Sequence, residues 1–411
     1  MLRRLSQGCS DMADNALDID FDDPQVLDNP SQIYARLQQE APAYWVERRR
    51  TWVLTTHADV KAVSAMNLVF SSAHGLFWSD TVPGATGSRG NVLGPDLLFL
   101  SEPPRHAELR RILAPAFSPR GVARLQTQVE MATAQLLDEL DLSSPIEWVS
   151  AVAKRLPTLL VVEILGLPRE DESELRAGAD ALEAAIGYEH GQPDGGFGSL
   201  KEYIQNAFAE KRAHPDERLI TTLSQLSAGT SVGETTLVDL VLTVIAGGNH
   251  TTRALLSGFA EAMAEHPDQY QLLRTRSDLI PSAIEECLRW VTPTRGHIRT
   301  ALEDTTIPSG QLVSAGQRVY LNYHAANRDP AAFGHPNEFD ISRESSKHQL
   351  AFGYGPRTCI AAPLVRSAMN IFIRQLSRRV ESIKKAGPEV RVDTMLRSGW
   401  DQLTVQLKAS A

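Results

Sequence analysis

The fold of this chain is decided by the stretch Phe352-Gly353-Tyr354-Gly355-Pro356-Arg357-Thr358-Cys359-Ile360-Ala361. A lone cysteine, Cys359, follows a glycine-punctuated loop that also carries a cation, Arg357. A buried thiolate stays ionised only beside a metal or positive charge. The glycines let the backbone pass close to a flat, bulky object, and Arg357 can bind a carboxylate on that object. These features together indicate a bound group with a metal at its centre and carboxylates at its rim.

The pattern Phe-Gly-x-Gly-x-Arg-x-Cys, which ends at Cys359, resembles the haem-binding loop of the cytochrome P450 family. The resemblance implies haem b as the cofactor, with its iron ligated by Cys359 and a propionate held by Arg357. Phe352 and Gly353 would then lie against the porphyrin. The alternative for this run alone is a buried structural cysteine that follows a turn.

Composition excludes several other classes of protein. The chain has 411 residues, of which 42% are hydrophobic, and a formal net charge of -9. The negative charge argues against nucleic acid as the main partner. No run approaches the roughly 18 apolar residues of a membrane helix, so no membrane is expected. Cys9, Cys287 and Cys359 are too few and scattered for a disulfide framework, which predicts a reducing, cytoplasmic setting.

The fold class expected from the resemblance is mainly α with small β-sheets. A helix-rich lobe and a small β-rich lobe would hold the haem between a long central helix and the cysteine loop. Residues 1–30 are expected to be an irregular segment, and residues 31–411 a single haem domain. We predict strands at 44–46, 51–54, 390–392 and 403–407, and helices at 105–117, 121–140, 145–166, 169–186, 200–212, 217–226, 267–275, 277–291 and 363–386.

The clearest predicted helix starts at Ser231 and stops before Pro267. Ser231 and Glu234 fit a capping box, and apolar residues then recur at helical spacing. At 1.5 Å per residue this is a rod roughly 50 Å long, enough to cross the protein.

The middle of this long helix reads Gly247-Gly248-Asn249-His250-Thr251. Each glycine costs a helix about 1 kcal/mol relative to alanine, which indicates that something approaches the backbone. By resemblance, Gly247 and Gly248 border the haem and Thr251 hydrogen-bonds bound dioxygen. His250 replaces the family's usual acid, and we hypothesise that it relays protons to Thr251. It could instead contact substrate or form a structural salt bridge, and the run alone also fits a glycine-softened helix contact.

Glu286 and Arg289 lie at i,i+3 spacing, so their side chains share a helix face. The pair resembles the family's Glu-x-x-Arg motif, and Arg343 would complete a buried charge network. Spacing alone does not select between Glu285 and Glu286, although the family register favours Glu286. Without the resemblance, an ordinary surface pair explains the spacing.

Cationic residues for the haem propionates are implied elsewhere in the chain. His106 and Arg110 are one helical turn apart, in a run that resembles the family's Pro-Pro-x-His-x-x-x-Arg stretch. Arg299 resembles the propionate arginine that follows the Glu-x-x-Arg helix. For His106 and Arg110 alone, a solvated basic face is the alternative.

The motifs occur in the family's order from about residue 30 to the end of the chain, with named departures. Ala361 replaces a glycine after the cysteine, Gln349 stands where many members have a histidine, and residues 364–368 lack the usual final glutamate. These changes leave open a tuned redox potential or altered partner docking.

The resemblance implies a haem-thiolate monooxygenase that inserts one oxygen atom of O2 into a small organic substrate. Because the chain has no flavin or iron–sulfur motif, electrons are expected from a ferredoxin and an NAD(P)H-dependent ferredoxin reductase. Their docking patch would include Arg105, Arg111, Arg357 and Arg366. The alternatives are a peroxide-driven or non-hydroxylating haem enzyme and a non-catalytic haem or ligand-binding protein.

The expected walls of the substrate pocket come from several separate segments. By resemblance they are Phe77 and Trp78, the region of Tyr188 and Phe197, the long helix, residues 294–298 and residues 396–400. Arg295 and His297 could meet a polar substrate group, a propionate or solvent. No sequence feature selects a particular substrate.

Overall fold

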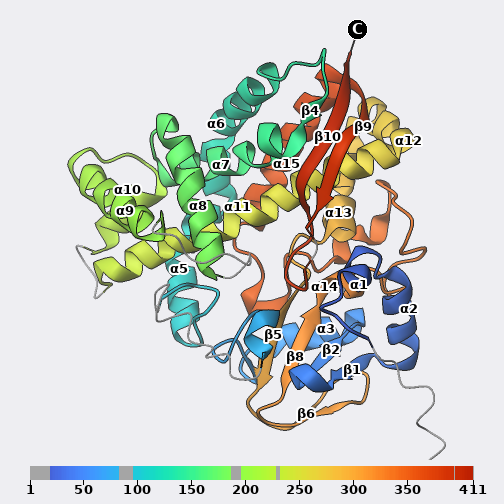
Figure 1. Ribbon diagram of the computed structural model, residues 1–411. Helices are drawn as coiled ribbons and strands as arrows, with labels where there is room; N and C mark the ends of the chain where they lie inside the picture. The colour runs from blue at the N-terminus through green and yellow to red at the C-terminus, as the bar shows by residue number, and fades with distance from the viewer. Residues whose placement is uncertain (1–18, 83–95, 187–195, 228–231, 393, 411) are drawn as a thin grey trace, which may run out of the picture.

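Helices form most of the molecule, and short strands form a second, smaller lobe (Figure 1). The computed structural model describes residues 19–82, 96–186, 196–227, 232–392 and 394–410. The helices are α1 (Pro24–Asp28), α2 (Ser31–Glu40), α3 (His57–Ala65), α5 (Arg105–Phe117), α6 (Pro119–Asp138), α7 (Arg155–Leu165), α8 (Glu172–Ile186), α9 (Gly196–Ala213), α10 (Leu219–Ser227), α11 (Glu234–Glu265), α12 (Pro267–Thr275), α13 (Ile280–Val291), α14 (Tyr323–Ala326) and α15 (Ala362–Arg379).

The strands form small sheets at the side of the helical lobe. A five-stranded sheet has the order β1 (Ala43–Val46), β2 (Thr51–Leu54), β8 (Arg318–Asn322), β5 (Gly296–Ala301) and β3 (Phe70–Ser71). Only β2 and β8 pair in parallel in this sheet. The second sheet has the order β4 (Ile146–Glu147), β10 (Trp400–Ala409), β9 (Val380–Arg391), and β6 (Thr305–Thr306) pairs with β7 (Leu312–Val313). The predicted fold class is thus confirmed.

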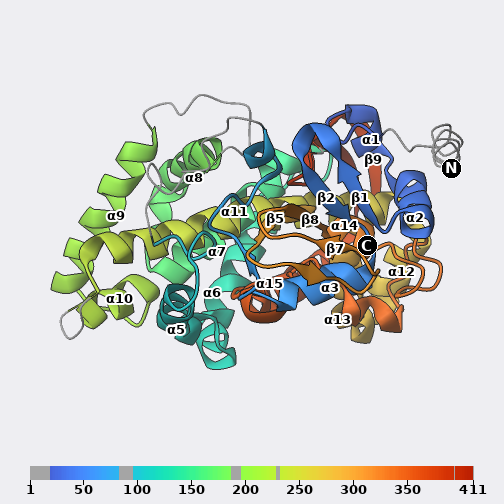
Figure 2. The ribbon, with the colours of Figure 1, turned by 90° about the horizontal axis from the view of Figure 1, so that it is seen from below.

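Helix α11 is the axis of the structure. It spans 32 residues and crosses the molecule from α8–α10 to the β-rich lobe (Figure 2). Most of its side chains are buried on all sides, which suits a helix inside a large core. Gly233 precedes its first turn without a side-chain cap. The predicted cap, Ser231, lies outside the described residues.

Three predictions on local structure were wrong. The last helix ends at Arg379 rather than 386, because the next twelve residues pair with β10 as strand β9. The predicted helix 145–166 is divided: Ile146 and Glu147 pair with β10, a π-helical turn follows, and α7 begins at Arg155. Within the segment 1–30, expected to be irregular, residues Pro24–Asp28 form α1. The first two errors share a cause, since sequence-distant strand pairing overrides local helix propensity.

Glu286 and Arg289 are both fully buried on α13 and form a bidentate ion pair, with N–O distances of 2.7 and 2.8 Å. Arg343 Nε donates to Glu286 Oε1 at 3.2 Å. Ser346 Oγ and the Asp340 amide also donate to this carboxylate. Glu285 instead pairs with Arg366, at 2.6 Å. The structure therefore assigns the network to Glu286, and α13 is fastened to the chain that leads to the cysteine loop.

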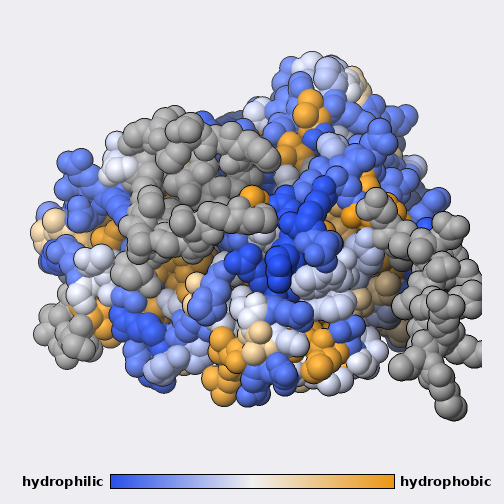
Figure 3. Space-filling view, turned by 60° about the horizontal axis from the view of Figure 1, so that its bottom comes forward, coloured by the Kyte–Doolittle hydropathy of each residue, from blue (hydrophilic) through white to orange (hydrophobic). Residues whose placement is uncertain are grey.

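The face of the molecule in Figure 3 is mostly hydrophilic where its residues are described, with scattered apolar patches. Leu68 is the most exposed large apolar side chain, at 74%. Among the described residues, no helix combines the length and apolarity that a membrane crossing requires.

We predict that Glu286→Gln lowers the free energy of unfolding by about 3–5 kcal/mol. The substitution keeps the shape of the side chain but leaves the buried Arg289 without its countercharge. Urea unfolding followed by circular dichroism measures the change. Asp278→Asn is the control, since its ion pair with Arg276 is 57–63% exposed and exposed pairs contribute little to stability. Equal losses in the two variants would contradict the network's role.

Candidate active site

Two positions in the loop before Cys359 have backbone angles that only glycine adopts without strain. Gly353 and Gly355 have φ of +68° and +74°, in the left-handed region. A Cβ on Gly355 would also lie 2.9 Å from the Cα of Ala65 on α3. The Cys359 amide donates to the Phe352 carbonyl at 2.8 Å and closes the loop. The glycine spacing seen in the sequence thus fixes where the sulfur lies.

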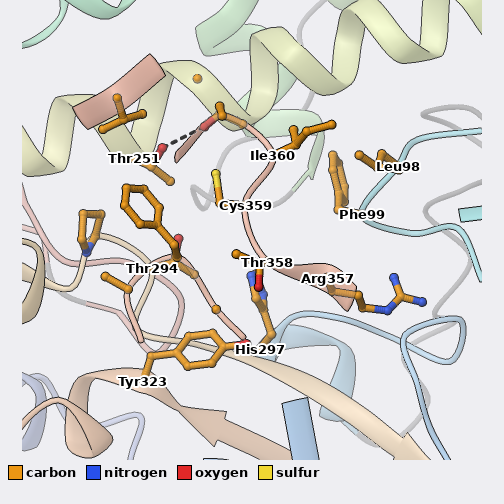
Figure 4. Close-up of a pocket in the computed structure, with 18 of the residues that line it drawn as sticks. Leu98, Phe99, Thr251, Thr294, His297, Tyr323, Arg357, Thr358, Cys359 and Ile360 are labelled. Carbon is orange, nitrogen blue, oxygen red and sulfur yellow. Dashed lines mark hydrogen bonds between the residues drawn. The ribbon is translucent and has the colours of Figure 1, made fainter. Parts of the chain in front are cut away.

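Cys359 Sγ points into a cavity toward α11, which carries Thr251 (Figure 4). Burial raises the pKa of the Cys359 thiol, opposed by the amides of Ala361 and Ala362 at the start of α15 and by Arg110 and Arg366. A thiol in this position stays protonated on its own. A metal ion at the sulfur would deprotonate it outright, so the site suits a metal ligand better than a free nucleophile.

The wall opposite Cys359 is the glycine-containing turn of α11. Gly247, Gly248 and Thr251 all line the cavity, and Thr251 Oγ1 donates to the Gly247 carbonyl at 2.8 Å (Figure 4). A Cβ on Gly247 would meet nothing within 4 Å. No neighbouring protein atom therefore requires a glycine at this position. Its effect is to leave space on the cavity side of the helix. That space suits a planar group between α11 and the sulfur.

The cations predicted for the propionates gather at one end of this cavity. His106, Arg110, Arg299 and Arg357 all line it, as do Phe352 and Gly353. Burial and then the three arginines lower the pKa of His106 to about 4. Arg299 is buried and the Arg357 side chain is nearly so, and buried cations require anions nearby. Among the described residues, Arg357 pairs with Glu102 at 2.6 Å, and no carboxylate pairs with Arg110 or Arg299.

Two further residues at this end were not assigned by the sequence. His297 faces the cavity, and its Nδ1 is buried without a hydrogen-bond partner among the described residues. Tyr323 lines the cavity beside it, with ring centroids 6.0 Å apart. From the sequence, His297 could meet a substrate group, a propionate or solvent. The sequence gave no signal for Tyr323, which follows β8 directly. In the tautomer that carries its proton on Nδ1, this unpartnered nitrogen can donate to a carboxylate of a bound group beside Arg299.

His250 lies on a different side of α11 from Thr251. It does not line the cavity of Cys359 but a small pocket with Arg253 and Arg397. Its pKa is lowered well below the usual value by burial, then by Arg397 and Arg253. Burial and the two arginines therefore favour the neutral ring of His250. The proton relay stays a prediction, and it has no direct geometric support.

Several expected walls of the substrate pocket lie elsewhere. Leu76, Leu98 and Phe99 line the cavity, whereas Phe77 and Trp78 do not. Trp78 donates to Asp22 instead. Thr294 and His297 line it, but Arg295 and residues 396–400 do not. Tyr188 lies outside the described residues, as does the side chain of Phe197.

The predicted basic patch is largely neutralised by ion pairs. Arg105 pairs with Asp96 at 2.7 Å, and Arg366 with Glu285 at 2.6 Å. Arg357 is buried against Glu102, so of the expected four only Arg111 is exposed without an ion pair to another described residue.

Comparison with known proteins identifies this architecture. The sequence profile described as Cytochrome P450 matches residues 197–398. Cytochrome P450 CYP107DY1 of Priestia megaterium is 34% identical over 71% of this chain and 71% of its own. Nocardicin C N-oxygenase of Nocardia uniformis is 30% identical over 90% and 93%. The epothilone B-bound cytochrome P450epoK has a TM-score of 0.86 and 25% identity, with coverage of 96% and 100%.

The fold and site thus define a haem-thiolate monooxygenase, and the chain belongs to the cytochrome P450 family. Its cofactor is haem, with the iron ligated by Cys359. The residues present fit this group, since Cys359, the glycine-containing turn of α11 and the cations Arg110, Arg299 and Arg357 line one cavity.

We predict that the folded chain loses stability as the pH falls below about 6.5, partly through His250. The unfolded chain protonates this histidine near its ordinary pKa of 6.5, whereas the folded chain keeps it neutral. The unfolded state then binds more protons, so stability falls by about 1.4 kcal/mol per pH unit for this residue. His250→Gln should flatten the slope between pH 6.5 and 5 by that amount.

Urea unfolding at successive pH values measures these slopes. His74→Gln is the control, because His74 is exposed and should leave the slope as it is in the parent. An unchanged slope in His250→Gln would show that His250 is not kept neutral by the fold.

Proposed function

We propose that this monooxygenase oxidises a small, largely apolar organic molecule with electrons from a ferredoxin and an NAD(P)H-dependent ferredoxin reductase in the cytoplasm. The observation that carries the proposal is the meeting of Cys359, Thr251 and an apolar wall in one cavity. Leu76, Leu98 and Leu255 contribute to that wall. Relatives named for linalool and steroid oxidation support a substrate of this kind.

The haem would supply the oxygen chemistry when bound, since a thiolate ligand such as Cys359 favours cleavage of the oxygen–oxygen bond. The remaining roles belong to the chain. His106, Arg110, Arg299 and Arg357 would hold and neutralise the propionates. Gly247 and Gly248 leave room beside the porphyrin, and Phe352 and Gly353 lie on the cysteine side.

We assign Thr251 to proton delivery on the face opposite Cys359. Its single hydroxyl proton is directed to the Gly247 carbonyl in this structure, so the oxygen can accept a hydrogen bond from the cavity, and rotation of the hydroxyl would turn the proton toward the cavity. A proton given up there would be replaced from water. His250 lines a separate pocket. If it takes part, it acts through the helix or through water and not by touching the reacting atoms.

Thr251→Val tests the role of the hydroxyl. The product formed per NAD(P)H consumed should fall on the order of tenfold, because the oriented proton donor is lost while the side-chain volume is kept. Thr251→Ser is the matched control and should retain the coupling of the parent. Equal coupling in the two variants would refute the role of the hydroxyl.

Cys359→Ser tests the thiolate by spectroscopy. The parent, reduced and treated with carbon monoxide, should show the absorption band characteristic of a thiolate-ligated haem, and the variant should lose it. The same band in the variant would remove Cys359 as the ligand.

The choice of electron donor is a separate experiment. Product formation by the parent enzyme is measured once with ferredoxin, reductase and NAD(P)H and once with hydrogen peroxide alone. Both measurements use the same substrate, which is first found by spectral titration of a small-molecule library. We expect faster product formation with the protein partners. Turnover that is faster with peroxide would favour the peroxide-driven alternative, which the missing acid at position 250 motivates.

A further inference from the structure

A second cavity lies further along the central helix, where Gly258, Glu261 and Glu265 of the C-terminal part of α11 line it. It has a volume of 150 Å³ and shares no lining residue with the haem cavity. Its walls come from the start of α2, from α11 and α13, and from the chain around Arg295, His324, Arg328 and Arg391. The proposed function uses none of these residues.

The start of α2 faces this cavity with an electropositive end. Pro30 and Ser31 line it, and α2 has ten residues and no side-chain cap among its described neighbours. The first amides of a helix have no partner within the helix. Together with the helix dipole they favour an anion at this position.

Arg328 adds a cation that the described residues do not neutralise. It donates through Nη2 to the Trp290 carbonyl at 2.7 Å and lies over the Trp290 ring. Its Nη1 is buried without a hydrogen-bond partner, and no ion pair is formed with any described carboxylate. Burial, then Arg289 and Arg295, lower the pKa of Arg328 to about 9. The local field is therefore positive.

His324 gives an independent indication of a missing ligand. Its side chain is 5% exposed and lines the cavity, and its Nδ1 is buried without a hydrogen-bond partner among the described residues. Burial and then Arg328, Arg295 and Arg391 lower its pKa well below the usual value. A buried polar atom without a partner is costly, and an oxygen of a bound anion would satisfy it.

Carboxylates also line this cavity, but each of them is either paired with a cation or exposed to solvent. Glu261 pairs with Arg391 and accepts from Trp400 Nε1 at 3.1 Å. Glu265 pairs with Lys385 at 2.8 Å, and Asp28 is exposed. Arg295 donates to the Leu27 carbonyl and to Ser398 Oγ, so it stays a cation beside the cavity.

We propose that this cavity binds a small tetrahedral oxyanion, such as phosphate or sulfate, between the α2 amides, Arg328 and His324. The anion would join α2 to the segment that follows β8 and to α13. It would stabilise the contact between the N-terminal helices and the rest of the protein without entering the haem cavity.

Isothermal titration of the haem-loaded enzyme with inorganic phosphate, at constant ionic strength in chloride, tests the proposal. We expect saturable binding at one site per chain and a rise in melting temperature of about 2 °C at saturation. Arg328→Gln and His324→Gln should each weaken the association about tenfold, because each removes a hydrogen bond to a charged group. Arg36→Gln, at an exposed position of α2 in an ion pair with Glu40, should bind as the parent does.

The haem absorption spectrum of each variant reports whether it has folded. If either Arg328→Gln or His324→Gln fails to fold, the remaining variant tests the proposal. Absence of saturable binding to the parent would mean that the cavity holds only water, and equal affinity in both variants would place the anion elsewhere. Either result overturns the proposal. Glycerol 3-phosphate is titrated in parallel: weaker binding than inorganic phosphate supports a free ion, and tighter binding identifies the phosphate group of an organic molecule as the same oxyanion ligand.

Discussion

A sulfur buried at the start of a helix is the contact on which the rest of the structure depends. Burial raises the pKa of the Cys359 thiol, so a metal must be present for the thiolate to persist at neutral pH. The metal is carried by a planar haem, which needs a flat space and countercharges. The glycines of α11 provide the space, and the buried cations around Arg299 provide the charges.

Rigid support for that contact comes from the other side of the loop. Glu286 holds Arg289 and Arg343 in a network in which each buried polar group has a partner. The same arginine, Arg289, also donates to the carbonyls of Asn327, Pro336 and Glu338. One buried pair thus fixes the chain that leads into the thiolate loop. Such a network costs free energy to desolvate but restricts the fold to one arrangement.

The charge pattern divides the protein into two electropositive interiors with different purposes. The one beside Cys359 would be matched by the propionates of the cofactor. In the one beside Arg328, which lies against the N-terminal helices, Arg391 pairs with Glu261, whereas Arg328 Nη1 has no hydrogen-bond partner among the described residues. The expected docking patch on the surface is weaker than the sequence indicated, since Arg105 and Arg366 form ion pairs.

The sequence by itself determined the thiolate loop, the long helix and most of the polar residues that line the cavity of Cys359. These depend on short-range patterns: glycines where φ is positive, helical spacing, and one cysteine after one arginine. Only the tertiary structure decided that residues 380–391 form a strand, because their partner, β10, is distant in the sequence. It also decided which way His250 and Arg295 face and which glutamate pairs with Arg289. The physical reason is that spacing along a chain fixes neighbours on one element, whereas the direction of a buried side chain depends on what packs against that element.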